Sequence, residues 1–561
     1  SRRLRWPEHS SCCELTWTNG RLFRSTPAKY RLIGSSSCRG PDGPRGGMAA
    51  TRVTHHGVLF VSIVNQHTPG MAPLDYGVII AYGLGMLAVG AYYARRTVSR
   101  EDYLLGGRQM RSSFVGLSLF ATLLSTITYL AMPGEVINKG PVILWTMVAI
   151  PIAYVVVGYL LIPRFMDLRV TSAYELLETR LGIQVRLLAS IIFLATRLLW
   201  MALIIHLTAD KIIVVMFGWD PKVIPYVSVV IGLVTVVYTS MGGLRAVVLT
   251  DVIQSLILLS GAILSIVVIT SEMGGVSAWW PREWSPSWDA QPVFSWDPTT
   301  RATVLGSIVF MTVWWICTAG SDQMAIQRYL ATRDAKAARR AFLVTGLANI
   351  IITLCLASLG FFQTHPELLA QGMTIDQDGD KLFPFFIVRF LRPGITGLVI
   401  AGLLAAAMSS LSSGINSASS VVSVDFVDRF RPPDRVDSDA AQMRRARLIA
   451  VVSGLAAVLL STVMGGVTGN IMEVTVRTNH IFVAPLFGLF FMALFVPFAT
   501  TVGTIVGAVA GCAVAVVIAY WDLITGGATL SFQWISLISL TVNMAVAIPL
   551  SAATYKPRTS S

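Results

Sequence analysis

The chain has 561 residues, of which 54% are hydrophobic and 13% charged, with a mean hydropathy of +0.66. Soluble domains carry about a quarter charged residues, so this composition excludes a soluble globular protein. The net charge of +13 does not indicate a nucleic-acid partner, because the basic residues lie in short loops between apolar segments, as in membrane proteins. The six cysteines show neither disulfide nor metal-ligand spacing.

The first 70 residues differ from the rest of the chain. They are rich in Arg, Ser, Pro and Gly and contain one short apolar run, Val58 to Val64, with no clear cleavage site after it. Such a run is short for a signal-peptide core. We expect residues 1–70 to be a non-structural extension, with translation starting at Met48 or Met71, because the membrane pattern begins directly after Met71.

Thirteen apolar spans follow, each close to the ~20 residues that an α-helix needs to cross the hydrocarbon layer. They cover approximately residues 74–94, 113–133, 142–163, 187–216, 223–240, 247–270, 302–325, 341–363, 394–424, 446–464, 475–496, 501–520 and 533–553. The sequence therefore predicts an all-α integral membrane protein with about 13 transmembrane helices.

The distribution of basic residues predicts how these spans are oriented. An odd number of spans places the two termini on opposite sides of the membrane. If the N-terminus is outside and the C-terminus inside, most loop Lys and Arg residues, Arg328 among them, fall in cytoplasmic loops, as the positive-inside rule requires. We predict a multi-pass plasma-membrane protein in this orientation, with the lipid bilayer as a partner and an oligomeric state that the sequence leaves open.

The span 113–133 carries Ser and Thr residues at mid-membrane depth and ends at Pro133-Gly134. We expect the helix to break at this Pro-Gly pair. A broken helix is tolerated in a membrane where its freed carbonyls meet protein, water or an ion. The alternative is a set of helix-packing hydroxyls followed by an ordinary helix end, and this segment alone favours neither interpretation.

The span 394–424 holds a dense group of Ser and Asn residues between Ser409 and Ser420, with no carboxylate before Asp425. Helix packing explains some of these hydroxyls. Neutral oxygens in such density suit a hard, singly charged cation better than a transition metal. Asp251, one helical turn into the span 247–270, is an intramembrane carboxylate and hence a functional candidate. The alternative for Asp251 is pairing with an interfacial Arg.

Taken together, these segments resemble the sodium:solute symporter family, which includes sodium–glucose, sodium–iodide, sodium–monocarboxylate and sodium–proline transporters. Each motif is weak alone, but their shared order is specific. In chain order they are Asp102 to Arg108 (DYLLGGR), Ser125 with Pro133-Gly134-Glu135 and Gly140, Thr171 to Arg180 (TSAYELLETR), Gly242-Gly243 with Thr250-Asp251 and Gln254, Asp322-Gln323 with Gln327-Arg328, Ala406 to Ser410 (AAMSS) with Asn416-Ser417, and Pro485 to Phe490 (PLFGLF).

The resemblance implies a leucine-transporter-like fold, in which two inverted five-helix repeats surround a site at the membrane midplane. Carried over to this chain, the symporter core covers residues 71–500, with repeats at about 113–270 and 302–496. Residues 501–561 would form a C-terminal addition of two helices and a tail.

The resemblance also implies a sodium site between the first and eighth core helices. Its ligands would be the carbonyl oxygens of Ala121, Leu124 and Ala406 and the hydroxyls of Ser409 and Ser410. Asp251 matches the carboxylate that the family places on the inward release route of sodium. The residues expected to line the substrate cavity are Thr126, Thr128, Tyr129, Trp314, Trp315, Thr318 and Asp322. Trp314 and Trp315 could equally be lipid-facing or core aromatics.

We therefore predict a sodium-coupled symporter, not an enzyme, that imports a small polar or anionic solute, with Na⁺ as the co-transported ion. A sugar symporter is one alternative, although Thr128 and Trp315 stand where galactose-binding members carry other polar groups. A proton-coupled symporter is a second alternative, which Ser409 and Ser410 argue against, because an acidic group would replace a sodium ligand. A membrane sensor is a different class, and the sequence contains no signalling module to support it.

Overall fold

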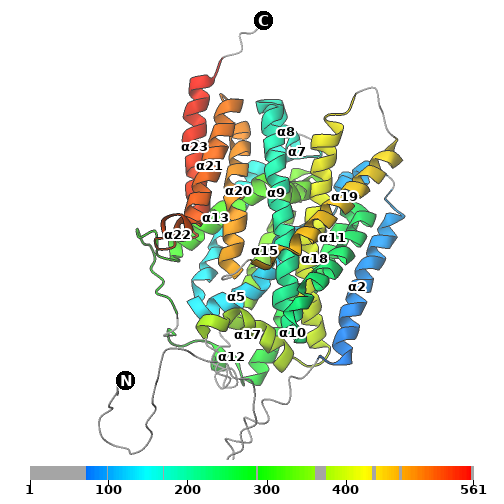
Figure 1. Ribbon diagram of the computed structural model, residues 1–561, viewed down its shortest axis with the longest axis vertical. Helices are drawn as coiled ribbons and strands as arrows, with labels where there is room; N and C mark the ends of the chain where they lie inside the picture. The colour runs from blue at the N-terminus through cyan, green and yellow to red at the C-terminus, as the bar shows by residue number, and fades with distance from the viewer. Residues whose placement is uncertain are drawn as a thin grey trace, which may run out of the picture. The chain divides into compact units, whose positions relative to one another are not determined.

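The computed structural model describes residues 71–556, apart from residues 98, 168–169, 286–287, 361–374, 433–437 and 467–470. Every regular element in this described part of the chain is a helix, and most of the long helices run along a common direction (Figure 1). The predictions about residues 1–70, including the start at Met48, lie outside the described residues.

The helices fall into long rods and short connecting segments. The long ones are α2 (Pro73–Ala94), α9 (Ile183–Leu207), α11 (Ile224–Glu272), α13 (Val304–Ser321), α15 (Ala335–Gly360), α17 (Ile375–Phe390), α18 (Ile395–Val421), α19 (Asp439–Ser461), α20 (Ile471–Phe495), α21 (Thr501–Ala519) and α23 (Trp534–Thr554). The short α-helices are α3 (Arg100–Leu105), α4 (Ser112–Leu123), α5 (Thr126–Lys139), α6 (Ala149–Val156), α7 (Ile162–Asp167), α8 (Glu175–Leu181), α10 (Val215–Phe217), α12 (Val276–Trp279), α14 (Gln323–Leu330) and α22 (Trp521–Thr525). Tighter or wider helical turns are η1 (Gly106–Arg108), η2 (Pro141–Val148), η3 (Val157–Leu161), η4 (Thr208–Val214), η5 (Pro221–Val223), η7 (Val422–Asp428) and η8 (Met464–Gly466).

All thirteen predicted spans overlap helices in the structure. By length and composition, ten helical runs among the described residues could each cross a membrane, and the bent pair α4–α5 could form an eleventh span. One of the ten, Pro221–Glu272, covers two predicted spans, 223–240 and 247–270. Helix α19 covers most of the predicted span 446–464 but is not among the ten. The number of crossings therefore stays a prediction.

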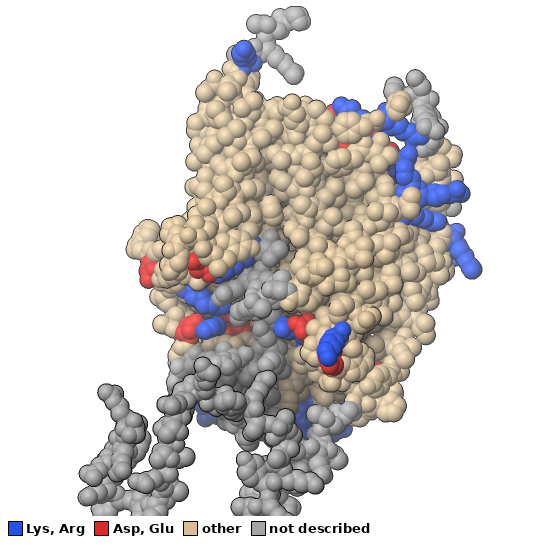
Figure 2. All heavy atoms as spheres, in the orientation of Figure 1, with Lys and Arg blue, Asp and Glu red and all other residues tan. Residues whose placement is uncertain are grey.

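The outward faces of these helices suit a membrane. Large apolar side chains such as Ile80, Leu84, Val155 and Leu459 are more than half exposed. Figure 2 shows a broad uncharged band between charged side chains near the upper edge and those in the lower part of the view. Polar backbone inside helices and apolar side chains outside are what a lipid solvent demands. The molecule is a multi-pass membrane protein.

The first predicted break lies elsewhere than expected. Helix α4 ends at Leu123, the backbone is extended at Leu124 and Ser125, and α5 starts at Thr126 at an angle of 64° to α4. Pro133 lies inside α5, so the prediction of a break at Pro133-Gly134 was wrong. Proline removes a hydrogen-bond donor, and this is a local signal. It does not reveal that the Ser125 hydroxyl, about two helical turns earlier, caps a new helix by accepting a hydrogen bond from Thr128 N.

A second break separates α13 from α14. The backbone is extended at Asp322 (φ −79°, ψ 124°), and the Asp322 carboxylate accepts a hydrogen bond from Met324 N, 2.9 Å away, as the cap of α14. The predicted span 302–325 thus contains a helix end at the very residue that was expected near the substrate. Breaks of this kind place free carbonyls and amides inside the membrane, where they need partners.

Helix α18 occupies the interior of the bundle (Figure 1). It is buried along almost its whole length and packs against α11, α2, α9 and α4. Its many Ala, Gly and Ser residues let these neighbours approach closely. Helices α21 and α23 pack against each other and against α20. The serine-rich stretch of α18 is therefore held against the end of α4, and this contact builds the site.

Candidate functional site

The C-terminal end of α4 faces the serines of α18. Ser409 Oγ donates to Ala121 O at 2.7 Å and lies 3.1 Å from Ala406 O in its own helix. Ser410 Oγ donates to Thr122 O at 3.1 Å. All of these residues are buried. The carbonyls at the end of α4 are free to accept these hydroxyls because the helix stops before a further turn can use them.

Three of the five predicted sodium ligands, those from Ala121, Ala406 and Ser409, are thus joined directly. Ser410 lies beside them but bonds the carbonyl of Thr122, which the sequence did not single out. Leu124 is buried in the break itself. The cluster consists of neutral oxygens from two helices, the donor set that suits an alkali cation. Among the described residues, no group of His, Cys, Asp or Glu could hold a transition metal.

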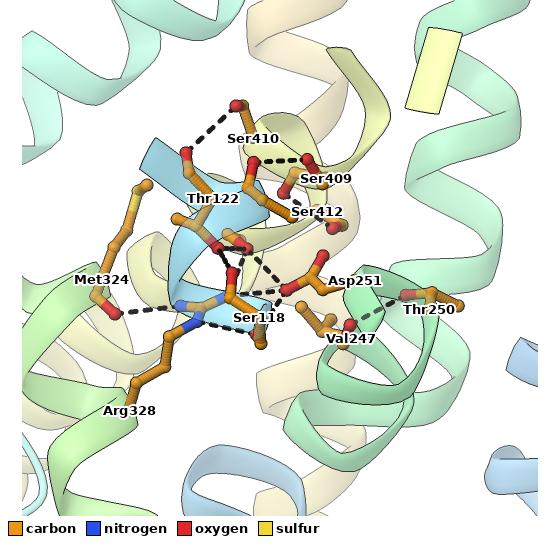
Figure 3. A network of polar contacts seen from close by, with 12 residues as sticks. Ser118, Thr122, Val247, Thr250, Asp251, Met324, Arg328, Ser409, Ser410 and Ser412 are labelled. Atoms are coloured by element: carbon orange, nitrogen blue, oxygen red, sulfur yellow. Dashed lines mark hydrogen bonds and ion pairs between the residues drawn. The ribbon is translucent and has the colours of Figure 1, made fainter. Parts of the chain in front are cut away.

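Asp251 lies beyond this cluster on α11 and is completely buried. Its Oδ2 atom accepts from Ser118 Oγ at 2.6 Å and from Arg328 Nη2 at 3.0 Å (Figure 3). Arg328 is also completely buried. The prediction that Arg328 lies in a loop was wrong: α14 is a short amphipathic helix that turns this arginine into the protein. Hydropathy alone does not separate such a helix from a loop, and the side of the membrane stays a prediction.

A line of side chains connects the two clusters. Thr122 Oγ1 lies 2.8 Å from Ser413 Oγ, one helical turn from Ser409 on α18. Ser413 in turn accepts from Arg328. Thr122 also bonds its own helix at Ser118 O, 2.7 Å away. Ser410, one of the predicted ion ligands, is therefore connected through Thr122, Ser413 and Arg328 to Asp251 in the bundle interior (Figure 3).

A cavity of about 130 Å³ opens beside the break between α4 and α5. Four of the predicted substrate residues line it: Thr128, Trp314, Trp315 and Thr318. The other lining residues are Thr122, Leu123, Leu124, Ser125, Met132, Ile143, Thr146, Met147, Ile150, Arg197, Trp200, Phe310, Met311, Asn349, Thr353, Thr475, Val476, Asn479 and His480. Aromatic walls with a few polar groups are typical of small-molecule sites.

The other three predicted substrate residues do not line this cavity. Thr126 Oγ1 donates to Leu403 O at 3.0 Å, and the Tyr129 hydroxyl donates to Leu258 O at 3.3 Å. Helical periodicity explains the difference, because Ser125 and Thr128 lie on one face of α5 while Thr126 and Tyr129 lie on another. Asp322 forms an ion pair with Arg197, which does line the cavity.

Sequence reasoning missed the polar groups that α9 and α20 contribute. Three buried atoms that these helices place on the cavity wall have no hydrogen-bond partner within the described protein: Arg197 Nε, Thr475 Oγ1 and Asn479 Oδ1. The same holds for Oγ1 of the predicted residue Thr318 on α13. The ring of His480 stacks on Phe310 with centroids 4.7 Å apart, and its Nδ1 lies 2.7 Å from Ser536 Oγ. An arginine inside an apolar span was the sequence signal that could have identified Arg197.

Residues 103–511 match the sodium:solute symporter family. The chain belongs to this family. It is 32% identical over 452 residues to the sodium/sialic acid symporter SiaT of Proteus mirabilis, which covers 77% of this chain and 87% of the relative. It is 28% identical to the human sodium-coupled monocarboxylate transporter 1, over 78% of this chain and 72% of the relative. Membership confirms the predicted class, a transporter rather than an enzyme, and sodium as the co-transported ion.

Solved structures agree on the fold. A sodium-coupled sialic acid symporter in a substrate-bound, outward-open state is 28% identical, with a TM-score of 0.72 over 87% of this chain and 99% of that one. The nucleobase-cation-symport-1 transporter Mhp1 in a closed conformation gives a TM-score of 0.53 at 12% identity, over 82% of this chain and 96% of that one, and shares the fold alone. The predicted leucine-transporter-like architecture is confirmed.

Proposed function

We propose that this symporter imports a small anionic solute by alternating access, driven by a sodium ion held between α4 and α18. The observation that carries the proposal is that the backbone at the end of α4 borders both the solute cavity and the expected sodium site. Thr122 and Leu124 line the solute cavity, while the Thr122 carbonyl accepts from Ser410 and the Leu124 carbonyl is an expected sodium ligand. A sodium ion at this break would fix the same backbone that shapes the cavity, and so favour the state that the solute binds.

The chemistry of the cavity supports an anionic solute. Arg197 carries the only guanidinium or carboxylate among the described lining residues, and its Nε atom has no partner. Guanidinium groups bind carboxylates through paired N–H donors, and such bonds are stronger than those between neutral groups. The named solutes of several relatives, sialic acid, monocarboxylates and iodide, are also anions. Trp314 and His480 would contact the less polar part of the solute.

Two alternatives predict different chemistry. A sugar symporter would bind a neutral solute, which leaves the Arg197 Nε donor without a charged acceptor. A proton-coupled symporter would need a titratable group at the ion site, whereas the groups gathered around Ala121 are hydroxyls and carbonyls. A membrane sensor would bind the solute without accumulating it.

The topology and the domain division are parts of the same proposal. The breaks after Leu123 and at Asp322 fall within the first helix of each expected repeat, 113–270 and 302–496, which supports the inverted pair. The cluster of Arg residues at the α19 end of the molecule supports a plasma-membrane orientation with the C-terminus inside (Figure 2). Residues 71–500 would then be the core, with residues 501–561 added to it.

Uptake into proteoliposomes tests the proposal. Purified protein is reconstituted, and an inward NaCl gradient is compared with an equal choline chloride gradient, at a clamped membrane potential. The labelled probes are sialic acid, lactate, iodide and galactose. We expect sodium-dependent accumulation of at least one anion and none of galactose. Accumulation driven equally by choline, or of galactose alone, contradicts the proposal, and solute binding without accumulation identifies a sensor.

A further inference from the structure

The two carboxylate oxygens of Asp251 have different surroundings. Oδ2 accepts hydrogen bonds from Ser118 and Arg328, at 2.6 Å and 3.0 Å. Oδ1 is just as deeply buried, yet it has no hydrogen-bond partner within the described protein. A buried carboxylate oxygen normally has a hydrogen-bond partner, because an unpaired oxygen loses its hydration without gaining a hydrogen bond that offsets the cost. One oxygen of this carboxylate is therefore held by the protein, and the other is left without a partner among the described residues.

Arg328 is fixed on every side of its guanidinium. Its Nε donates to Ser118 Oγ at 2.9 Å, and its Nη1 donates to Met324 O at 2.9 Å within α14. Its Nη2 donates to both Asp251 and Ser413. These contacts tie α14 to α4, α11 and α18 at one point (Figure 3). The guanidinium cannot shift to cover Oδ1 without losing several of these hydrogen bonds.

The position of this pair gives it a role in ion movement. The hydrogen-bonded line from Ser410 through Thr122 to Ser413 connects the expected sodium ligands with Asp251 and Arg328. A sodium ion that leaves its ligands along this line reaches a carboxylate with one free oxygen. A lone buried carboxylate would hold the ion very tightly, because charges attract strongly in a medium of low dielectric constant. A symporter must release the sodium ion again in each transport cycle.

We propose that Arg328 is a positioning residue for sodium release. It holds Asp251 by Oδ2, leaves Oδ1 free to receive the ion, and places a positive charge beside the ion so that Asp251 passes it on instead of trapping it. The inference rests on the proposed sodium-coupled function. It differs from a purely structural salt bridge in one respect: removing the guanidinium charge should tighten sodium binding, whereas a structural pair would only lose stability.

The test compares purified R328Q, R328K and R186Q proteins with the wild type. Arg186 is the matched control, because it is buried and its Nη2 pairs with Asp425 Oδ1 at 2.6 Å, away from the network around Asp251. Sodium affinity is measured from the rise in melting temperature with NaCl relative to choline chloride, and release from the rate of ²²Na⁺ exchange in proteoliposomes. Tighter binding is expected mainly as slower release.

For R328Q we expect sodium to bind about tenfold more tightly and to exchange about tenfold more slowly, because the repulsion between the guanidinium charge and the ion is lost. A tenfold change in affinity corresponds to about 1.4 kcal/mol. R328K keeps the charge and should exchange sodium within about twofold of the wild-type rate. R186Q should melt at a lower temperature with its sodium affinity unchanged. Together, these three results distinguish an effect of the positive charge of Arg328 from a general loss of stability.

Unchanged or weaker sodium binding by R328Q contradicts the inference. So does failure to recover R328Q even in high NaCl, because sodium should then take the place of the guanidinium beside Asp251 and restore the fold. The proposed function fails separately: if the wild type neither binds nor exchanges sodium, both ideas are wrong, whereas normal wild-type exchange with an indifferent R328Q rejects the role of Arg328 alone.

Discussion

Ser409 on α18 donates a hydrogen bond of 2.7 Å to the carbonyl oxygen of Ala121, the residue two positions before the end of α4. The bond joins helices that are far apart in the sequence and closes the polar network from which the solute cavity opens. A hydroxyl oxygen and carbonyl oxygens at one point offer a cation several ligands without any fixed negative charge.

The break in α11 depends on Gly243. Its backbone has φ 63° and ψ −163°, a region that only glycine occupies comfortably, and a Cβ there would lie 2.6 Å from the Tyr103 ring. We expect Gly243→Ala to destabilise the fold by about 1–3 kcal/mol from backbone strain alone. Gly77→Ala is the control, because a Cβ at Gly77 meets nothing within 4 Å. Melting temperatures of the two purified variants check this, and equal values contradict the account.

Arg197 should decide solute affinity. Because Arg197→Lys keeps the positive charge beside Asp322 but loses the planar fork of donors, we expect KM for the transported anion to rise about tenfold. Sodium affinity should stay within about twofold, since no hydrogen bond among the described residues joins Arg197 to the expected ion ligands. Initial rates of uptake at varied solute and fixed sodium measure KM, and rates at varied sodium and fixed solute measure the sodium affinity. A change confined to sodium dependence would place Arg197 outside the solute site.

Low pH should weaken the ion pairs that Glu178 on α8 forms with Arg186 and Arg429. Hydrogen bonds from Arg429 and Arg186 lower the pKa of Glu178 below its usual value of 4.5. A carboxylate with a lowered pKa contributes stability that is present above its unfolded-state pKa and is lost as the pH falls through the folded-state value. We therefore expect the melting temperature of Glu178→Gln to differ from the wild type at pH 7 and to converge with it as the pH falls through the lowered pKa of Glu178. A difference that persists at low pH would show that the charge is unimportant.

The class and the helices could be predicted from the sequence, because apolar spans and the order of the motifs are read directly along the chain. The predicted ion ligands Ala121, Ala406 and Ser409 do lie together, and their binding of sodium stays a prediction. The break after Leu123 could not, since it depends on Ser125 capping a helix in a place that no proline marks. Arg328 was misplaced for a similar reason, because its partners Asp251 and Ser413 come from other helices. The face of α5 that lines the cavity required knowing where α5 begins, and Thr126 and Tyr129 fell on the other side.

The central claim is that sodium is held by neutral oxygens from α4 and α18. It is tested most directly by the double variant Ser409→Ala, Ser410→Ala, assayed for anion accumulation over a range of external sodium at a fixed membrane potential. Ser419→Ala is the matched control, because its hydroxyl bonds Ala446 O on α19 instead. Loss of two ligands, each contributing about 1–3 kcal/mol, should raise the half-saturating sodium concentration at least tenfold and abolish accumulation at ordinary sodium levels. A double variant that responds to sodium as the control does would contradict the claim.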